Sequence, residues 1–308
     1  MKKVFLFSGQ GGQFPGMLQG FSKDSDAAEI LQQAEDLLHR KTESIDSKEA
    51  LQSNQNVQLS LFLYEAAALS ILRAMIGKPD FTAGHSIGAF SAAFCAESLS
   101  FEDALSAVKF RGELMESAYP EGFGMGAVLG LGEQTVRKLT GETQEDDRPV
   151  YIANLNAPHQ ITVSGKIPDI QHFFKAAGMA GAYRTKLLDV SVPSHCPLME
   201  DVSSALAEKL SKMTMQDAGI PYMSNSRARM VKKKEEIRRD LALSVSLPVR
   251  WHDGMSMIYE RGFRLYIEIG PGEVLSRLMK DNFSDARSVS CGTSGVEDIE
   301  QWMRRLTV

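Results

Sequence analysis

Cysteine and tryptophan are scarce in this chain, and it has no long uninterrupted apolar run. Among 308 residues there are three cysteines and two tryptophans. Three scattered cysteines are too few for a disulfide framework or a zinc cluster, so we expect reduced thiols, no metal site and a cytoplasmic protein. The apolar run Val4–Phe7 is too short for a secretory signal. The apolar stretch 57–76 is interrupted by polar residues, and it predicts a buried helix rather than a membrane span.

A surplus of positive charge is lacking as well. Lysine and arginine total 34 against 39 acidic residues, which gives a net charge of −5. Nucleic-acid binding draws on counterion release at a positive surface, so this balance argues against a general nucleic-acid binder. Hydrophobic residues make up 43% of the chain and charged residues 24%, which is typical of a soluble globular protein. The length predicts one large domain or two unequal ones.

Strand-like and helix-like segments alternate along much of the chain, which predicts an α/β fold with a largely parallel sheet. The texture changes after residue 122, where strand, helix, strand, strand, helix and strand follow one another. This order is the ferredoxin-like arrangement. We therefore expect a discontinuous α/β domain, formed by 1–122 and 194–308, with a ferredoxin-like insert at 123–193.

The segment Gly84-His85-Ser86-Ile87-Gly88 has the pattern G-x-S-x-G. An apolar strand precedes it and a helix of small residues follows, which is the setting of a nucleophile elbow. The two glycines permit a tight turn that pushes the serine hydroxyl outward, and the amide of Ile87 can face a developing oxyanion. The alternative is a glycine-rich turn between strand and helix with a structural serine.

A serine nucleophile needs a base, and the chain has six histidines. His195 follows a predicted strand end, where loops assemble sites, although it can also serve only to pack its loop. His85 adjoins Ser86 and should point away from it in a sharp turn. We expect His39 and His172 to be solvated on helix surfaces.

Seven segments, in this order and over nearly the full chain, resemble the malonyl-CoA:acyl-carrier-protein acyltransferases. The resemblance implies an α/β-hydrolase-like large domain with a mostly parallel sheet plus an inserted ferredoxin-like small domain. It also implies malonyl-CoA as substrate, an acyl carrier protein as partner and no tightly bound cofactor. The matching segments are Phe7-Ser8-Gly9-Gln10-Gly11-Gly12-Gln13, Gly84-His85-Ser86-Ile87-Gly88, Lys109-Phe110-Arg111-Gly112-Glu113-Leu114-Met115, Asn154-Leu155-Asn156-Ala157-Pro158, Val192-Pro193-Ser194-His195-Cys196, Pro248-Val249-Arg250-Trp251 and Glu268-Ile269-Gly270-Pro271-Gly272.

Carried over residue by residue, the resemblance implies that Ser86 is the nucleophile and His195 the general base. The backbone amides of Gln10 and Ile87 match the oxyanion hole. Arg111 matches the arginine that binds the substrate carboxylate, and a planar guanidinium suits this task because it can hold a malonyl group bidentately.

In this family a backbone carbonyl, not an aspartate, orients the histidine, and we assign that carbonyl to Arg250. The family often has glutamine or asparagine at the position we match to Arg250, so arginine is a departure. Four further residues lie in or near the matching segments and are candidates for the substrate pocket: Met115, Met125, Asn156 and Ser194.

The chain departs from the family pattern at other positions, and some of its segments point to one branch of the family. Ala89 stands where the elbow commonly continues with glutamate, and Ser8 and Gly12 replace a proline and a serine. The continuation Gly88-Ala89-Phe90 and the segments 119–125, 226–229 and 249–253 most resemble the epsilon subunit of biotin-independent malonate decarboxylase. We therefore predict malonyl transfer within that system, with its other subunits as possible partners. The alternative is a malonyl-CoA:acyl-carrier-protein transacylase of fatty-acid or polyketide synthesis, and a serine acyl hydrolase is the third interpretation.

The densest basic cluster of the chain, hereafter the basic cluster, consists of Arg227, Arg229 and Lys232-Lys233-Lys234. Carrier proteins are usually acidic, so this cluster could steer a carrier toward the protein. A solvated face without a partner is the alternative, and we favour it.

Overall fold

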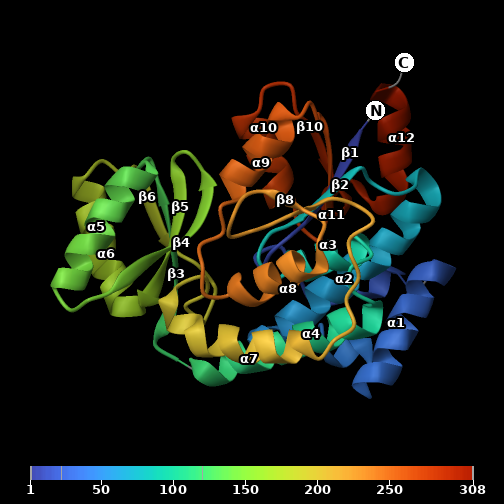
Figure 1. Cartoon of the computed structure of the whole chain (residues 1–308), viewed down its shortest axis with the longest axis horizontal. Helices are drawn as coiled ribbons and strands as arrows, with labels where there is room; N and C mark the ends of the chain where they lie inside the picture. The colour runs from blue at the N-terminus through green and yellow to red at the C-terminus, as the bar shows by residue number, and fades with distance from the viewer. Residues whose placement is uncertain (1, 22, 120, 307–308) are drawn as a thin grey trace.

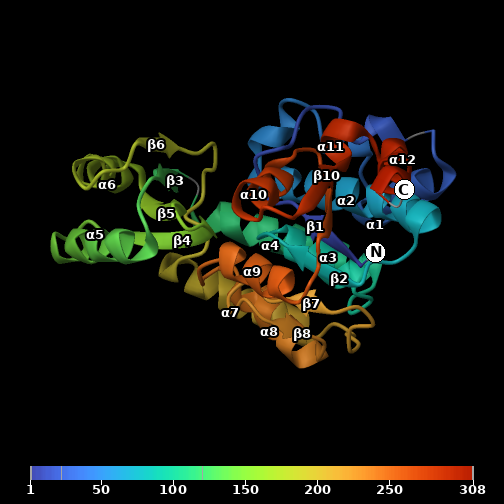
Figure 2. The same cartoon turned by 90° about the horizontal axis from the view of Figure 1, so that it is seen from above.

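The computed structural model describes residues 2–21, 23–119 and 121–306. Pro120, which belongs to the branch-specific segment 119–125, lies outside these described residues. Figures 1 and 2 show two units side by side, a larger one that carries both ends of the chain and a smaller one near the middle of the sequence.

The larger unit is built on a six-stranded sheet with the order β10-β9-β1-β2-β7-β8. Every neighbouring pair is parallel except β7 and β8. The mostly parallel sheet that the alternating segments predict is therefore confirmed. Its strands are β1 (Lys3–Phe7), β2 (Phe81–Gly84), β7 (Tyr222–Met223), β8 (Met230–Val231), β9 (Leu265–Ile269) and β10 (Arg287–Ser290).

Helices cover both faces of this sheet. Successive side chains of a strand point to opposite faces, and in β1 both sets are buried. Phe5 and Phe7 pack into the cluster formed with α1 to α4, whereas Val4 and Leu6 pack into the cluster formed with α9 and α10. The helices of the larger unit are α1 (Ser25–Leu38), α2 (Asn54–Ile76), α3 (Gly88–Cys95), α4 (Phe101–Ala118), α7 (Glu200–Ser211), α8 (Lys234–Leu243), α9 (Trp251–Glu260), α10 (Val274–Asn282), α11 (Cys291–Ser294) and α12 (Val296–Leu306), with 3-10 turns at Gln19–Phe21, Thr42–Ser44, Ala50–Gln52 and Pro197–Met199.

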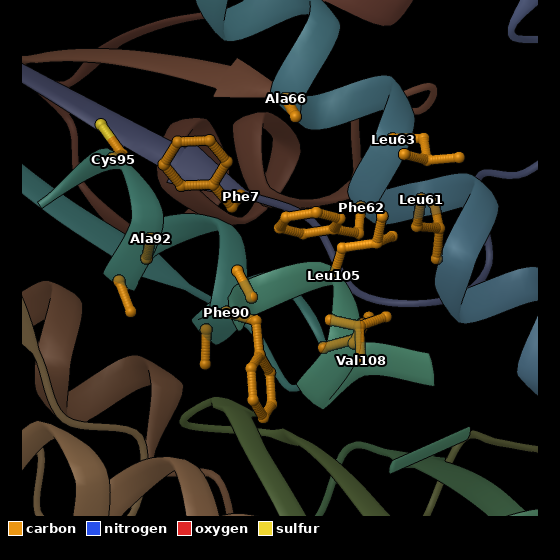
Figure 3. Packing of buried hydrophobic residues seen from close by; sticks show 14 of the residues in the cluster. Phe7, Leu61, Phe62, Leu63, Ala66, Phe90, Ala92, Cys95, Leu105 and Val108 are labelled. Carbon is orange, nitrogen blue, oxygen red and sulfur yellow. The ribbon is translucent and has the colours of Figure 1, made fainter. Parts of the chain in front are cut away.

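Helix α2 is central to the larger core. It is long and apolar enough to cross a membrane by length and composition, but 72% of its most apolar window is buried inside the protein. Figure 3 shows Leu61 and Phe62 of α2 near Leu105 and Val108 of α4, and all four belong to one buried cluster. The predicted buried helix is confirmed.

The smaller unit is an antiparallel sheet with the order β4-β5-β3-β6. Its elements are β3 (Phe123–Leu129), α5 (Glu133–Glu145), β4 (Val150–Ala157), β5 (Gln160–Lys166), α6 (Ile167–Met179) and β6 (Arg184–Leu187). Val136 of α5 and Phe173 of α6 pack on the sheet in a separate buried cluster. The predicted ferredoxin-like order is therefore present, while the division of the chain into 1–122 plus 194–308 and 123–193 stays a prediction.

Backbone hydrogen bonds join the two units where β4 meets the segment before α9. The amide of Leu155 donates to the carbonyl of Val249 at 2.8 Å, and the amide of Val249 donates to the carbonyl of Ala153 at 2.9 Å. Asn154 and Val249 thus form an isolated parallel bridge. This bridge holds the smaller sheet beside the larger one.

Candidate active site

Four loops meet at one edge of the larger sheet because their parallel strands end there. Strand β1 leads into residues 8–12, β2 into residues 85–88, β7 into Ser224 and Asn225, and β9 into Gly270. Residues that are far apart in the sequence therefore share one place in the fold.

The loop after β2 is a sharp turn that only small residues permit. A Cβ atom on Gly84 would lie 2.0 Å from the backbone oxygen of Gly88, and one on Gly88 would lie 2.4 Å from the backbone oxygen of Phe7. Ser86 itself has φ = 55°, a left-handed conformation that residues with a side chain rarely adopt. The structure thus has the strand–turn–helix shape that the G-x-S-x-G pattern predicts.

The fold brings His195 to Ser86, although 109 residues separate them in the sequence. The Nε2 atom of His195 lies 2.8 Å from the Oγ atom of Ser86. His195 is 2% exposed and also has a left-handed backbone, with φ = 63°. By contrast, the ring of His85 lies 3.0 Å from Oδ1 of Asn156 through Nε2 and packs against Trp251.

The carbonyl that faces the other ring nitrogen of His195 belongs to Ser244, not to Arg250. Ser244 follows the last residue of α8, and the last carbonyls of a helix have no partner within it. It is therefore free to accept a hydrogen bond from Nδ1. The Arg250 carbonyl instead accepts the amide of Gly254 at 3.1 Å, at the start of α9. The prediction that Arg250 orients His195 is wrong.

The surroundings of His195 favour its neutral form. Burial, followed by the positive charge of Arg111 and the neighbouring His85, lowers the pKa of His195 to about 3. With Nδ1–H directed to the Ser244 carbonyl, the lone pair of Nε2 faces Ser86. A neutral imidazole held in this tautomer can accept the serine proton.

Arg111 of α4 reaches the same serine. Its Nη2 atom lies 3.3 Å from Oγ of Ser86, and its Nη1 donates to Oε1 of Gln58 at 2.5 Å. The side chain is 1% exposed and its Nε has no partner among the described residues. Burial alone lowers the pKa of Arg111 to about 9, so the guanidinium stays charged at pH 7. A buried cation without an anionic protein partner is costly, and an anionic ligand would stabilise it.

The two amides predicted for the oxyanion hole lie at adjacent loops. Within the described part of the chain, neither the Gln10 amide nor the Ile87 amide donates to another protein group. Ile87 directly precedes α3, where the helix dipole adds positive character. The loop that carries Gln10 is supported by Ser8, whose hydroxyl donates to buried Glu65 at 3.1 Å. The proline common at that position has no such donor.

Two cavities, each of about 240 Å³, flank Gln10. The first lies between the two units and is lined by the 8–12 loop, by the smaller sheet, including Asn156, and by the start of α10. The second is lined by Gln10 with Asn54 and the segment 189–191, among others. Of the four predicted pocket residues, Asn156 therefore lines a cavity, whereas neither of these cavities is lined by the other three, Met115, Met125 and Ser194.

A comparison with protein families matches residues 4–300 to the acyl transferase domain. The chain belongs to this family. It is an acyltransferase, as the sequence predicts.

Relatives of this acyltransferase are similar over nearly their whole length. The malonyl CoA-acyl carrier protein transacylase of Bacillus subtilis (strain 168) is 37% identical over 284 residues, which is 91% of this chain and 90% of the relative. The protein of the same name from Staphylococcus aureus (strain COL) is 35% identical over 306 residues, 98% of both chains.

Solved structures of the family share the fold of this chain. One is the structure of a type II polyketide-synthase acyl-carrier protein in complex with its malonyl-transacylase. The matched chain of that structure is 30% identical to this one, with a TM-score of 0.92 over 98% of this chain and 99% of that chain. The transacylase from Streptococcus pneumoniae is also 30% identical, with a TM-score of 0.91 over 98% of this chain and 100% of that one. The predicted α/β fold class is thereby confirmed.

Three residues at the candidate site were missed from the sequence. Gln58 accepts from Arg111, Ser244 faces His195, and Asn225 contacts the nucleophile turn. Gln58 carries a signal, because a glutamine inside an apolar helix needs a buried partner. Ser244 contacts His195 through its backbone carbonyl, so its residue type gives no indication of this role. Asn225 follows a strand of only two residues, which no clear pattern marks.

Acidic neighbours neutralise much of the basic cluster. Arg229 pairs with Glu236 at 2.5 Å and Lys233 with Asp217 at 2.7 Å, and all four side chains are largely solvated. This pairing favours the solvated-face interpretation over carrier steering. Among the described residues, no group of three His, Cys, Asp or Glu side chains could hold a metal ion.

Proposed function

We propose that this acyltransferase moves malonyl groups from malonyl-CoA to the phosphopantetheine thiol of an acyl carrier protein of fatty-acid or polyketide synthesis. The observation that carries the proposal is Arg111, a buried guanidinium that has no acidic partner among the described residues and lies 3.3 Å from the Ser86 hydroxyl. A malonyl group esterified to Ser86 would bring its free carboxylate to this cation. An acetyl group has no carboxylate and gains nothing there.

The relatives reported above favour this function over a malonate decarboxylase epsilon subunit. Those from Bacillus subtilis and Staphylococcus aureus are named as malonyl CoA-acyl carrier protein transacylases, and one solved relative is bound to a polyketide carrier. Support for the decarboxylase system comes from the branch-specific segments and from Ala89 in the elbow. We therefore adopt the alternative that the sequence left open, and we propose no decarboxylase subunits as partners.

In the first half-reaction His195 acts as general base. Its neutral Nε2 takes the proton of Ser86, and Oγ forms a bond to the thioester carbonyl carbon of malonyl-CoA. The resulting oxyanion lies against the amides of Gln10 and Ile87. The carbon–sulfur bond then breaks, His195 returns the proton to the departing CoA sulfur, and malonyl remains as an ester of Ser86.

The second half-reaction repeats these steps in reverse with a different thiol. The phosphopantetheine thiol of the carrier gives its proton to His195, and its sulfur attacks the malonyl ester of Ser86. The ester carbon–oxygen bond breaks, His195 reprotonates Oγ, and the carrier leaves with the malonyl thioester. Ser244 keeps the ring in one tautomer through both halves because its carbonyl accepts from Nδ1.

We place the reaction in the cytoplasm. Cys95, Cys196 and Cys291 are all buried and unpaired, and free thiols suit a reducing compartment.

Intact-mass spectrometry after brief mixing with malonyl-CoA or acetyl-CoA tests the proposal. We expect a malonyl adduct on the wild-type protein, none on Ser86→Ala, and weak acetyl labelling. In Arg111→Ala, malonyl labelling should fall by about 100-fold relative to acetyl, since a charge-assisted pair is lost from a buried site. Arg137→Ala removes an exposed arginine paired with Glu133 and should change neither label. Rapid release of free malonate without transfer to a carrier would instead mean a hydrolase.

A further inference from the structure

Asn225 clamps the nucleophile turn on both sides. Its Oδ1 accepts the backbone amide of Ser86 at 3.1 Å, and its Nδ2 donates to the backbone carbonyl of Gly84 at 2.8 Å. Asn225 is fully buried. In this left-handed turn, a side chain from the end of the adjacent strand β7 therefore pairs both a backbone donor and a backbone acceptor.

Asp240 of α8 in turn fixes the loop that carries Asn225. Its carboxylate accepts the amide of Asn225 at 2.9 Å and the hydroxyl of Tyr222 at 2.9 Å. It also accepts the hydroxyls of Ser224 and Ser226, at 2.5 and 2.9 Å, and the amide of Ser226 at 3.2 Å. Asp240 is 3% exposed. Five donors on one buried carboxylate define the position of the whole loop after β7.

The same helix holds the base. The amide of Ser244 donates to the backbone carbonyl of Asp240 at 2.8 Å, and the Ser244 carbonyl faces Nδ1 of His195. About one helical turn therefore separates Asp240, which supports the nucleophile turn, from Ser244, which follows the end of α8 and orients the imidazole. This arrangement fixes the two reacting side chains against one rigid element.

We propose that Asn225 and Asp240 are positioning residues of the acyl-transfer reaction: Asp240 fixes the loop after β7, and Asn225 holds Ser86 at hydrogen-bonding distance from His195. This inference rests on the proposed role of Ser86 as nucleophile. Neither residue touches the reacting atoms, so both act on the geometry of the attack. A displacement of about 1 Å at a reacting group can cost on the order of 100-fold in rate.

Labelling of Ser86 by a small fluorophosphonate, followed by intact mass, measures this geometry without malonyl-CoA or a carrier. The serine oxygen attacks phosphorus, fluoride leaves and His195 takes the proton. We expect Asn225→Ala to label about 100-fold more slowly than wild type, and Asp240→Asn about tenfold more slowly because part of its acceptor set remains. Malonylation of the same variants should slow by the same factors with KM for malonyl-CoA nearly unchanged.

Glu35→Gln is the matched control. Glu35 also organises a turn, accepting the amide and the hydroxyl of Thr42 at 3.0 and 3.1 Å, but on α1. It should label at the wild-type rate. Amide hydrogen exchange supplies a second readout, since Ser86 should lose protection in Asn225→Ala and keep it in Glu35→Gln.

Coupling between the two residues decides whether Asp240 acts through Asn225. The double variant Asn225→Ala/Asp240→Asn should label no more slowly than Asn225→Ala alone. The proposal would be overturned if the fold-losses of the two single variants multiplied in the double variant. It would also be overturned if the Asn225→Ala protein were folded and labelled at the wild-type rate. If Asn225→Ala does not fold, Asn225→Ser and Asp240→Asn carry the same test. A wild-type protein that labels with fluorophosphonate but takes no malonyl would refute the malonyl function, while the labelling rates would still decide this inference.

Discussion

The nucleophile turn at 84–88 and the segment at 244–250 perform matched tasks in different ways. The turn presents Ser86 through steric demands that only particular residues meet, since Cβ atoms on Gly84 or Gly88 would collide with backbone. The later segment holds His195 through the carbonyl of Ser244, which any residue can provide. The sequence therefore indicates how Ser86 is presented, because the turn requires particular residues, but it does not indicate which carbonyl orients His195.

This difference explains where residue-by-residue transfer from a family succeeds. The side chains of Ser86, His195 and Arg111 were matched by residue type within their motifs, and the structure brings the three together, although their roles remain proposals. A backbone role carries over only if the alignment has the right register. The assignment to Arg250 failed because that residue is the N-cap of α9, and its carbonyl accepts the amide of Gly254 in the first turn of the helix.

The largest expected effect breaks the nucleophile turn. Gly84→Ala would place a Cβ 2.0 Å from the Gly88 oxygen, so we expect loss of more than about 3 kcal/mol of unfolding free energy or failure to fold. Gly141→Ala is the control, because a Cβ there meets nothing within 4 Å in α5 and should stabilise by about 0.5–1 kcal/mol. Urea unfolding followed by circular dichroism measures both. Equal stability of the two variants would contradict the steric account.

The second effect concerns the pKa of His195, which is set by the residues packed around its ring. Because His195 has a pKa of about 3, it stays neutral down to about pH 5, and fluorophosphonate labelling should be nearly flat from pH 8 to pH 5. Arg111 lowers this pKa by its charge, so Arg111→Gln should raise the pKa and move the acid limb of labelling to higher pH, while burial, the larger cause, keeps the pKa below that of a free imidazole. Arg137→Gln should leave the profile flat. A wild-type acid limb near pH 6.5 would show that the imidazole is not desolvated.

The same shift has a consequence for stability. When the pKa of a histidine is lower in the folded than in the unfolded protein, the unfolded chain binds more protons at a pH between the two pKa values. Lowering the pH through that range therefore lowers the free energy of unfolding. The contribution of His195 to stability is therefore full above about pH 6.5 and is lost as the pH falls toward 3. The acid limb of activity and the acid loss of stability thus have one physical origin.

Much of the fold could be predicted because the order of strand-like and helix-like segments along the chain indicates how its sheets are built. Alternating segments predict the parallel sheet, and the strand and helix order between Phe123 and Leu187 predicts the smaller sheet. Gln58 carried a local signal, an amide inside an otherwise apolar helix, which marks a buried polar contact. Asn225 and Ser244 lacked such signals because strand adjacency and a helix end, not residue type, bring them to the site.

The smallest expected effects sharpen the comparison at the base. The Ser244 side chain only donates back to the carbonyl of Leu241 at 3.2 Å, so Ser244→Ala should change the labelling rate less than about twofold, because the orienting carbonyl remains. Arg250→Gln should likewise stay within about twofold, since its side chain pairs with Asp253 at the surface. Stopped-flow acylation with malonyl-CoA measures both variants beside wild type. A tenfold loss in Arg250→Gln alone would return the orienting role to that residue. Acylation rates close to wild type in both variants would mean that the segment 244–250 holds His195 through its backbone. Side-chain substitutions in this segment should then be tolerated as long as the end of α8 is preserved.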